Sequence, residues 1–260
     1  MQVILFAKNP QNHFTNAILR VGRFKDDITI TGDRFIEGNL FNQVVDAEEA
    51  IKNFINVRYE ITGEEFTRKD VWDYPLEAIR EILLNAIVHR NYHLHNMQTQ
   101  IRVYDDHIWF HNAGGLPAGM TMELLKKPHR SVARNPLISK IFYLSGLVEE
   151  YGTGIKRIVD SMRKANRVEP VFKEEMGGFS VYIGKTVYDK NYFKEQGLNE
   201  RQISVMMYVM KKGSIKIDEY CRIAPNVSER TLQRDLNFLI ERRLLVKAGG
   251  SKNIRYEKVI

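Results

Sequence analysis

One stretch of the sequence decides how the larger part of the chain folds: Pro75-Leu-Glu-Ala-Ile-Arg-Glu-Ile-Leu-Leu-Asn-Ala-Ile-Val-His89. Proline suits the first turn of a helix, and residues 82–88 are apolar on every side except at Asn85. A helix that is apolar all round is covered on most sides. We therefore predict a buried helix that carries a polar pair, because Glu81 precedes Asn85 by one helical turn.

The pair of Glu81 and Asn85 is a candidate site for Mg2+ and an activated water. A buried amide without a partner costs about 1–3 kcal/mol, so Asn85 is expected to have a partner or a ligand. In a site of this kind the carboxylate acts as a base and the amide oxygen binds the metal. The sequence therefore predicts Glu81 as the base and Asn85 as the metal ligand.

The sequence around this helix indicates an α+β domain. An amphipathic helix is expected from about Leu40 to Ile55, with Val44 and Val45 among its buried residues. Residues 118–150 show no strong period. Strand patterns occur at Val3–Phe6, Ile28–Ile30, Val57–Ile61, Glu65–Lys69, Gln98–Tyr104, His107–Asn112, Pro170–Lys173 and Phe179–Gly184.

Two glycine turns follow the central helix. Ala113-Gly-Gly-Leu-Pro117 comes directly after a predicted strand, and Gly152-Thr-Gly154 opens a predicted helix. Glycine lets the backbone approach a ligand closely, or simply makes a turn. A helix N-terminus offers free N–H groups and a positive dipole end to phosphates.

These features together resemble a known superfamily. Glu81-x-x-x-Asn85, Asn112-Ala-Gly-Gly115 and Gly152-Thr-Gly154, in this order, resemble the N, G1 and G2 boxes of the GHKL ATPases. Longer stretches are similar to the GHKL-like domain of transcriptional regulators described as RecG-like C-terminal or Schlafen/AlbA-type. These are Glu-Ile-Leu-Leu-Asn-Ala-Ile-Val-His-Arg-Asn-Tyr92, Asn-Ala-Gly-Gly-Leu-Pro117, Arg-Asn-Pro136 and Glu-Glu-Tyr-Gly-Thr-Gly-Ile155.

The resemblance covers about residues 1–185 and implies a GHKL (Bergerat-like) α/β sandwich. Relatives usually carry an additional N-terminal domain, so we expect this chain to be a fragment or a natural short form. ATP and Mg2+ are the implied ligands, with Glu81 as catalytic base of an ATPase and Asn85 as metal ligand. The implied cofactor-binding residues are Asn85, Asn112, Gly114, Gly115, Gly152 and Gly154.

Two positions depart from the superfamily pattern. Asn112 stands where the superfamily has the aspartate that accepts a hydrogen bond from adenine N6, and His89 stands at a position that is acidic in many members. The amide oxygen of Asn112 can accept the same bond, but a neutral acceptor makes a weaker one. We therefore expect loose nucleotide binding without fast hydrolysis.

A second motif lies near the C-terminus, in Ser228-Glu-Arg-Thr-Leu-Gln-Arg-Asp-Leu236. Leucines and Ile240 recur at helical spacing and predict a buried face. The opposite face carries arginine and amide side chains, which are the groups that read guanine and adenine edges in DNA. The expected DNA contacts on this helix are Arg230, Gln233, Arg234 and Asn237.

The elements around this helix indicate a winged helix-turn-helix. A capping box at Asn199 starts one helix, residues 216–225 predict a second, and two strands flank the turn at residues 249–253. Three helices and a two-stranded wing resemble the winged-helix domains of bacterial and archaeal regulators. In the wing, Lys252 and Arg255 are expected on phosphate. The alternative is a winged helix that serves only protein contacts or dimerisation.

Charge and composition fit this division. Residues 198–260 hold 13 Lys and Arg against 7 Asp and Glu, which is +6 of the whole chain's +7. A basic surplus in the smaller part favours a polyanionic partner. We predict a GHKL-like domain over 1–190 and a winged-helix DNA-binding domain over 198–260, with a linker near 187–197.

Other classes of protein are disfavoured. The single cysteine, Cys221, excludes a disulfide framework. The sequence has no apolar run of about 18 residues, the length that a membrane span needs, and we expect a cytoplasmic protein without a membrane partner. The expected function is a transcriptional regulator that binds double-stranded DNA as a homodimer, with exposed Phe142 and Tyr143 as candidate interface residues. The alternatives are a Mg-dependent GHKL ATPase acting on DNA and a structural dimerisation scaffold.

Overall fold

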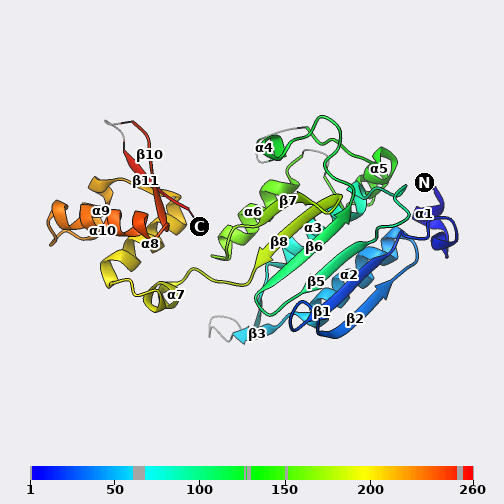
Figure 1. Cartoon of the computed structure of the whole chain (residues 1–260), viewed down its shortest axis with the longest axis horizontal. Coiled ribbons are helices and arrows are strands. Elements are labelled where there is room, and N and C mark those ends of the chain that lie inside the picture. Colours follow the sequence, from blue (N-terminus) through cyan, green and yellow to red (C-terminus); the bar gives the residue numbers. More distant parts are fainter. Residues whose placement is uncertain are drawn as a thin grey trace. The chain divides into compact units, whose positions relative to one another are not determined.

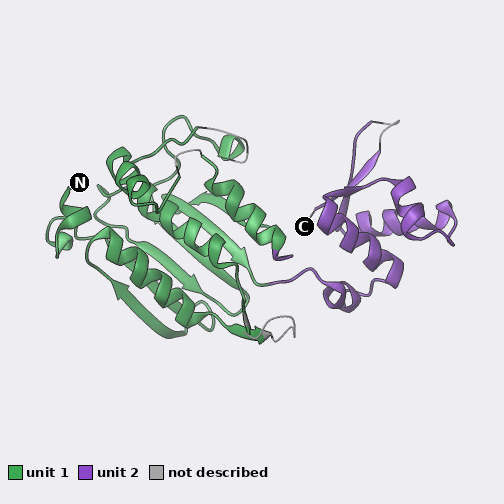
Figure 2. Ribbon diagram, turned by 180° about the vertical axis from the view of Figure 1, so that it is seen from behind, with its two compact units in different colours: residues 1–164, 169–185 green, residues 165–168, 186–260 purple. Residues whose placement is uncertain are grey.

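The computed structural model describes residues 2–60, 68–125, 127, 130–149, 152–250 and 254–259 (Figure 1). The chain divides into two compact units (Figure 2). Unit 1 comprises residues 1–164 and 169–185, and unit 2 comprises residues 165–168 and 186–260. The division after residue 185 lies slightly before the expected linker. Each unit has its own hydrophobic core.

Unit 1 is built on a mixed six-stranded sheet in the order β2-β1-β5-β6-β8-β7. The pair of β1 and β5 is parallel, and the other pairs are antiparallel. This confirms the α+β class and both predicted hairpins. The strands are β1 Leu19–Phe24, β2 Ile30–Ile36, β5 Thr99–Val103, β6 His107–Ala113, β7 Val171–Glu175 and β8 Gly178–Gly184, with a separate pair β3 Val57–Glu60 and β4 Lys69–Trp72.

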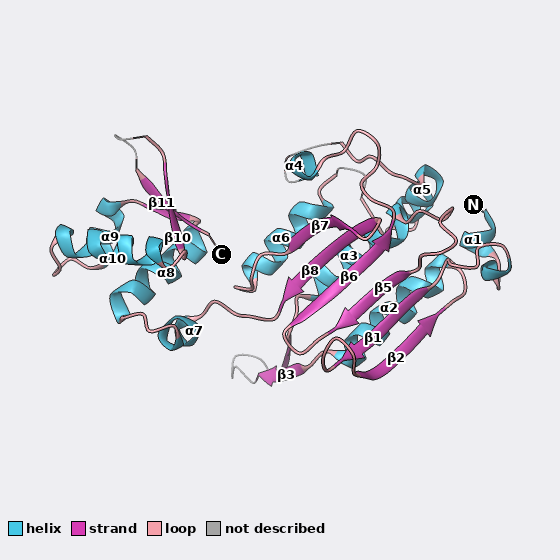
Figure 3. Ribbon diagram, in the orientation of Figure 1, coloured by secondary structure: helices cyan, strands magenta, loops and turns pink. Residues whose placement is uncertain are grey.

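Three longer helices cover one face of this sheet (Figure 3). They are α2 Leu40–Phe54, α3 Leu76–His89 and α6 Gly154–Lys164. Helix α3 lies between the other two, and the predicted helical pattern is confirmed at both of its ends. The shorter helices are α1 Gln2–Phe6, the 3-10 turn η1 Pro10–Asn12, α4 Met122–Leu125 and α5 Pro136–Leu144.

The C-terminus of α3 is held by side chains that satisfy its last carbonyl groups. The buried amide of Asn135 donates to the carbonyl oxygens of Val88 at 2.8 Å and Arg90 at 2.7 Å. The buried Arg90 guanidinium in turn donates to the carbonyl of Ile18, just before β1. Because helix ends leave carbonyls unpaired, the His-Arg-Asn-Tyr and Arg-Asn-Pro stretches have a structural role as an anchor for α3.

Three sequence predictions for unit 1 are wrong. Val3–Phe6 belongs to a helix rather than a strand, because a short apolar run suits either element and Ile4 and Leu5 are buried in α1. Val45 is 63% exposed, although its neighbour Val44 is buried. Phe142 is fully buried rather than exposed. Strand β1 was not anticipated at all.

The described residues of unit 2 form four helices and a three-stranded sheet in the order β10-β11-β9. The capping box at Asn199 is confirmed. Phe193 of α7 is fully buried, so the expected linker is part of the folded unit. The elements are α7 Lys190–Glu195, α8 Glu200–Lys212, β9 Ser214–Ile215, α9 Ile217–Ile223, α10 Glu229–Glu241, β10 Leu245–Ala248 and β11 Arg255–Lys258.

A buried carboxylate joins the helices of unit 2. Asp235 of α10 is only 6% exposed. It accepts hydrogen bonds from Gln202 at 3.0 Å and Arg201 at 3.1 Å, both on α8, and from the Tyr220 hydroxyl of α9 at 3.2 Å. Since a buried charge must be paired and hydrogen-bonded, this cluster fixes the rotation of α10 about its axis.

Asn135→Ala is expected to destabilise unit 1. The substitution leaves the carbonyls of Val88 and Arg90 without their donor, which costs about 1–3 kcal/mol. Both tryptophans, Trp72 and Trp109, lie in unit 1, so urea unfolding followed by tryptophan fluorescence reports on this unit alone. The exposed Asn96→Ala serves as the control. Equal midpoints for the two variants would show that the Asn135 amide does not anchor α3.

Candidate functional site

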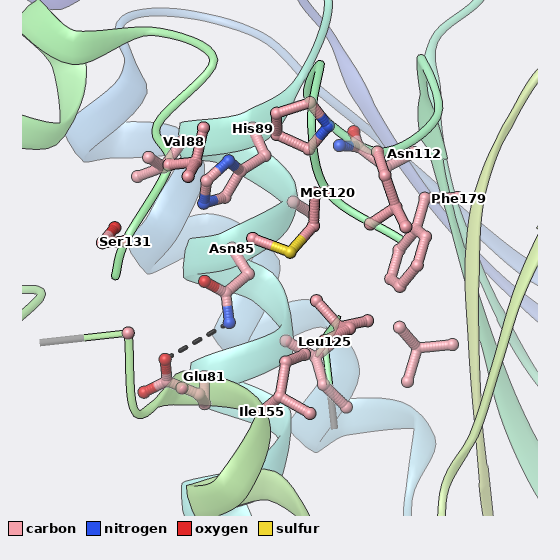
Figure 4. Close-up of a pocket in the computed structure, with 18 of the residues that line it drawn as sticks. Glu81, Asn85, Val88, His89, Asn112, Met120, Leu125, Ser131, Ile155 and Phe179 are labelled. Carbon is pink, nitrogen blue, oxygen red and sulfur yellow. Dashed lines mark hydrogen bonds between the residues drawn. The ribbon is translucent and has the colours of Figure 1, made fainter. Parts of the chain in front are cut away.

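A cavity in unit 1 gathers all of the glycine and polar residues that the sequence singled out there. It lies between α3, the start of α6, the end of β6, the first half of β8 and the segment after β6 (Figure 4), and its volume is about 140 Å³. The remaining lining is largely apolar, including Met120, Leu125 and Phe179. The predicted residues that line it are Glu81, Asn85, Asn112, Gly114, Gly115, Gly152 and Gly154.

A polar stripe on α3 forms one wall of the cavity. Glu81, Asn85 and His89 follow one another at four-residue spacing and all line it. The Asn85 amide nitrogen donates to Glu81 Oε1 at 3.2 Å, which points its oxygen away from Glu81 (Figure 4). Asn85 is half-buried rather than fully buried. Its oxygen is therefore positioned to bind a ligand in the cavity.

Opposing effects act on the Glu81 carboxyl. Burial raises its pKa, while the Arg157 guanidinium, 3.7 Å away, and the Asn85 hydrogen bond lower it. Arg157 also pairs with Glu149 on the cavity rim. A carboxylate with a raised pKa is suited to general-base chemistry. Arg157 was not identified from the sequence, although its place in the first turn of α6, just after Gly154, was a usable signal.

The glycines at the start of α6 are required by close approach and by backbone conformation. A Cβ at Gly154 would lie 2.3 Å from Glu81 Oε1 and 3.0 Å from Asn85 Nδ2. Gly152 has φ +68°, a left-handed conformation that other residues rarely adopt. The N-terminus of α6 can therefore meet the polar stripe of α3 directly.

The glycines after β6 are also required by backbone conformation and by close approach of neighbouring atoms. Gly114 has φ +88°, and a Cβ there would lie 2.8 Å from Asn91 Cβ. A Cβ at Gly115 would lie 2.4 Å from Glu174 Oε1, and the same carboxylate accepts a hydrogen bond from the Leu116 N–H at 2.7 Å. This turn therefore brings the backbone close to the cavity.

Asn112 lies at the end of the cavity formed by β6. It is 7% exposed, and its amide oxygen accepts a hydrogen bond from the Thr99 hydroxyl at 2.8 Å. The oxygen that was expected to face adenine N6 therefore already has a partner within the protein. Thr99 was not singled out from the sequence, because its contact with Asn112 depends on the pairing of β5 with β6.

His89 is the most strongly perturbed titratable group of the cavity wall. Burial lowers its pKa to about 4, and the nearby positive charge of Arg134 adds to the effect. Its buried Nδ1 has no hydrogen-bond partner among the described residues. The imidazole is therefore neutral at physiological pH. Across the part of the chain that the structure describes, no three His, Cys, Asp or Glu side chains form a metal-binding group.

A second candidate surface lies on α10 of unit 2. Arg230, Arg234 and Asn237 are exposed, and they line a shallow hollow together with Gln233 and Glu229. The sequence prediction of one polar face on this helix is confirmed, whereas its role in DNA binding stays a prediction.

Two of the other expected DNA contacts have partners within the protein. The Gln233 amide donates to the Tyr256 hydroxyl of β11 at 2.7 Å. Arg255 pairs with Glu257 at 2.5 Å. Lys252 lies outside the described residues. The unpaired cations on this face are therefore Arg230 and Arg234, among the residues that the structure describes.

Part of unit 1 is similar to a known protein family. Residues 96–183 match the family described as "Putative ATP-dependent DNA helicase recG C-terminal". This segment is therefore similar to the C-terminal RecG region that this family describes. The match includes Asn112 and the glycines of the cavity, but it begins after Glu81 and Asn85. No curated protein matches the chain.

The fold also occurs in a solved structure. The crystal structure of the DIP2311 protein from Corynebacterium diphtheriae is similar, with a TM-score of 0.61 and 19% sequence identity. The similarity covers 94% of this chain and 52% of that protein, so this chain spans about half of its length. None of the described helices is long and apolar enough to cross a membrane.

His89 predicts a pH dependence of stability. The unfolded histidine takes up a proton near pH 6.5, whereas the folded one stays neutral until about pH 4. The free energy of unfolding should therefore fall as the pH drops through this window, by up to about 1.4 kcal/mol per pH unit. Urea midpoints from tryptophan fluorescence at pH 7 and pH 5 measure this loss.

Two variants isolate the contribution of His89. In His89→Gln the loss between pH 7 and pH 5 should be smaller than in the parent protein. In His95→Gln, which changes an exposed histidine, the loss should be unchanged. An equal loss in His89→Gln and in the parent would mean that His89 is protonated in the folded protein.

Proposed function

We propose that this chain is a DNA-binding transcriptional regulator whose larger unit binds a nucleoside triphosphate. The observation that carries the nucleotide part is the meeting of three separate motifs on one cavity. Glu81 and Asn85 come from α3, Asn112 comes from β6, and Gly152 and Gly154 come from the start of α6. ATP is the first candidate because the matching family is described as ATP-dependent.

The cavity offers complementary groups to a triphosphate. At the start of α6, the Arg157 N–H donates to the carbonyl of Thr153, the residue just before the helix. The N–H groups that precede Arg157 in the first turn lack such helical acceptors, and N–H groups of this kind suit phosphate oxygens. Mg2+ usually binds through one or two protein oxygens together with phosphates and water, and Asn85 Oδ1 fits that role. When bound, Mg2+ would neutralise phosphate charge.

Glu81 is the candidate catalytic residue of the same site. Its pKa is raised by burial, and its hydrogen bond with Asn85 places it beside the proposed metal ligand. A Mg-dependent ATPase is therefore the second candidate, with Glu81 as base. We expect slow turnover at most, because the neutral Asn112 offers a weak contact to the base. Phosphate release by the Glu81→Gln variant, compared with the parent protein, separates the two candidates.

Two substitutions test nucleotide binding with opposite expected results. Asn85→Ala removes the proposed Mg2+ ligand. It should abolish the Mg2+-dependent part of ATP binding, which in the parent protein is the part lost when EDTA is added. Asn112→Asp supplies a charged acceptor for adenine N6 and should tighten Mg-ATP binding by roughly tenfold, since hydrogen bonds to charged groups are the stronger ones. Titration calorimetry measures both.

The exposed Asn96→Ala is the control and should bind Mg-ATP as the parent protein does. If neither the parent protein nor Asn112→Asp gives heat with Mg-ATP, adenine nucleotide binding is contradicted. If Mg-ITP also gives no heat, the alternative of a structural dimerisation scaffold is favoured.

The DNA-binding part of the proposal rests on unit 2. Helices α8, α9 and α10 with strands β9, β10 and β11 have the element order of a winged helix. Asp235 is paired with Arg201 rather than with its neighbour Arg234, so Arg234 remains available. The surplus positive charge of residues 198–260 supports a polyanionic partner. We include a homodimer in the proposal, because two copies would read two half-sites.

Arg230→Ala with Arg234→Ala is expected to weaken binding of the full chain to duplex DNA. Contacts to base edges contribute about 1–3 kcal/mol each, and loss of a phosphate contact lowers the salt slope by about one. Fluorescence anisotropy at several salt concentrations measures both, and sedimentation of the complex gives the number of chains bound.

The exposed Lys211→Ala on α8 is the matched control and should keep the parent affinity. DNA binding that does not depend on salt would contradict the proposed role of α10 in DNA binding. An equal loss of affinity in Lys211→Ala would contradict it as well.

A further inference from the structure

Thr99 and Asn112 form a cross-strand pair at the end of the cavity where the base of the proposed nucleotide would lie. This pair determines which group the protein offers to the base. Thr99 starts β5 and Asn112 lies near the end of β6, on neighbouring antiparallel strands. Thr99 is 1% exposed and does not line the cavity, whereas Asn112 does. The Thr99 hydroxyl donates to Asn112 Oδ1 at 2.8 Å. Thr99 therefore acts on any ligand only through Asn112.

This hydrogen bond orients the amide of Asn112. An asparagine side chain has one acceptor oxygen and one donor nitrogen. With the oxygen held by Thr99, the nitrogen is left to the cavity, and it has no hydrogen bond to another described residue. The group that Asn112 offers to a ligand is therefore a donor.

Among the described residues, the carboxylates of this cavity already have other partners. The two carboxylates that line the cavity, Glu81 and Glu149, both pair with Arg157 at the start of α6. Glu174, behind the Gly115 turn, accepts from the Leu116 N–H. A ligand that presents an amino group to Asn112 would place two donors face to face.

We propose that this cavity prefers a 6-oxopurine nucleotide to a 6-aminopurine nucleotide, and that Thr99 is the positioning residue that sets this preference. The proposal rests on the proposed nucleotide binding. The oxygen at C6 of hypoxanthine or guanine accepts the hydrogen bond that the Asn112 nitrogen donates. The amino group at C6 of adenine cannot accept it, and leaving a buried donor unpaired is costly.

The test compares Mg-ITP with Mg-ATP on the full chain, because the two nucleotides differ only at C6 and in the proton on N1. Calorimetry should show Mg-ITP binding to the parent protein at least roughly tenfold tighter than Mg-ATP, as expected for one buried hydrogen bond gained or lost. In Asn112→Asp the two oxygens are acceptors, so the ratio of affinities should shift towards Mg-ATP.

Two variants of Thr99 separate positioning from packing. Thr99→Val keeps the volume but lacks the hydroxyl, so the amide of Asn112 is free to turn. Both nucleotides should still bind, with an affinity ratio close to one. Thr99→Ser keeps the hydroxyl and should keep the preference for Mg-ITP. Tryptophan fluorescence verifies that each variant is folded, and Thr99→Ser together with Asn112→Asp supplies the answer if Thr99→Val does not fold.

The outcomes distinguish this inference from the proposed function. If neither nucleotide binds to the parent protein or to Asn112→Asp, both the proposed nucleotide binding and the base preference are contradicted. If Mg-ATP binds as tightly as Mg-ITP or more tightly, nucleotide binding stands and the base preference is overturned. An unchanged preference in a folded Thr99→Val would overturn the role of Thr99.

Discussion

The candidate site depends on the direct contact between the start of α6 and the polar stripe of α3. Gly154 has no side chain where a Cβ would lie 2.3 Å from the Glu81 carboxylate. This contact brings the positive end of the α6 dipole to an acid and an amide that a buried helix would otherwise not tolerate. A larger residue there would push the carboxylate aside or move the helix, and either change would alter the cavity that both helices line.

The contact between α6 and α3 can be maintained only if the C-terminal end of α3 is held in place. Asn135, at the start of α5, donates to carbonyl groups at the end of α3, and Arg90 donates to the carbonyl of Ile18 just before β1. The helix interior is apolar, so these polar anchors define its position along its own axis. A shift along that axis would carry Asn85 away from Gly154. Some residues in the sequence stretches that resemble a family therefore anchor α3, and others line the cavity.

Much of the site could be predicted from the sequence because its signals are local. The spacing of Glu81 and Asn85 on an apolar helix, and the glycine turns after β6 and before α6, each lie within a few residues. Thr99 could not be found in this way, since its contact exists only after β5 pairs with β6. The run Val3–Phe6 was misassigned because four apolar residues fit a helix or a strand equally well. Strand β1 was missed because Gly22 and two arginines interrupt its apolar pattern.

Both candidate surfaces follow one physical rule. A buried polar group that is satisfied inside the protein determines which neighbouring group is left for a ligand. Asp235 takes Arg201 as its partner, so Arg234 beside it remains exposed. The Asn85 nitrogen is used by Glu81, so its oxygen faces the cavity. The Asn112 oxygen is used by Thr99, so its nitrogen is left over. The internal partners of these residues therefore set their chemistry as much as the residue types do, which is why a motif alone does not determine the ligand.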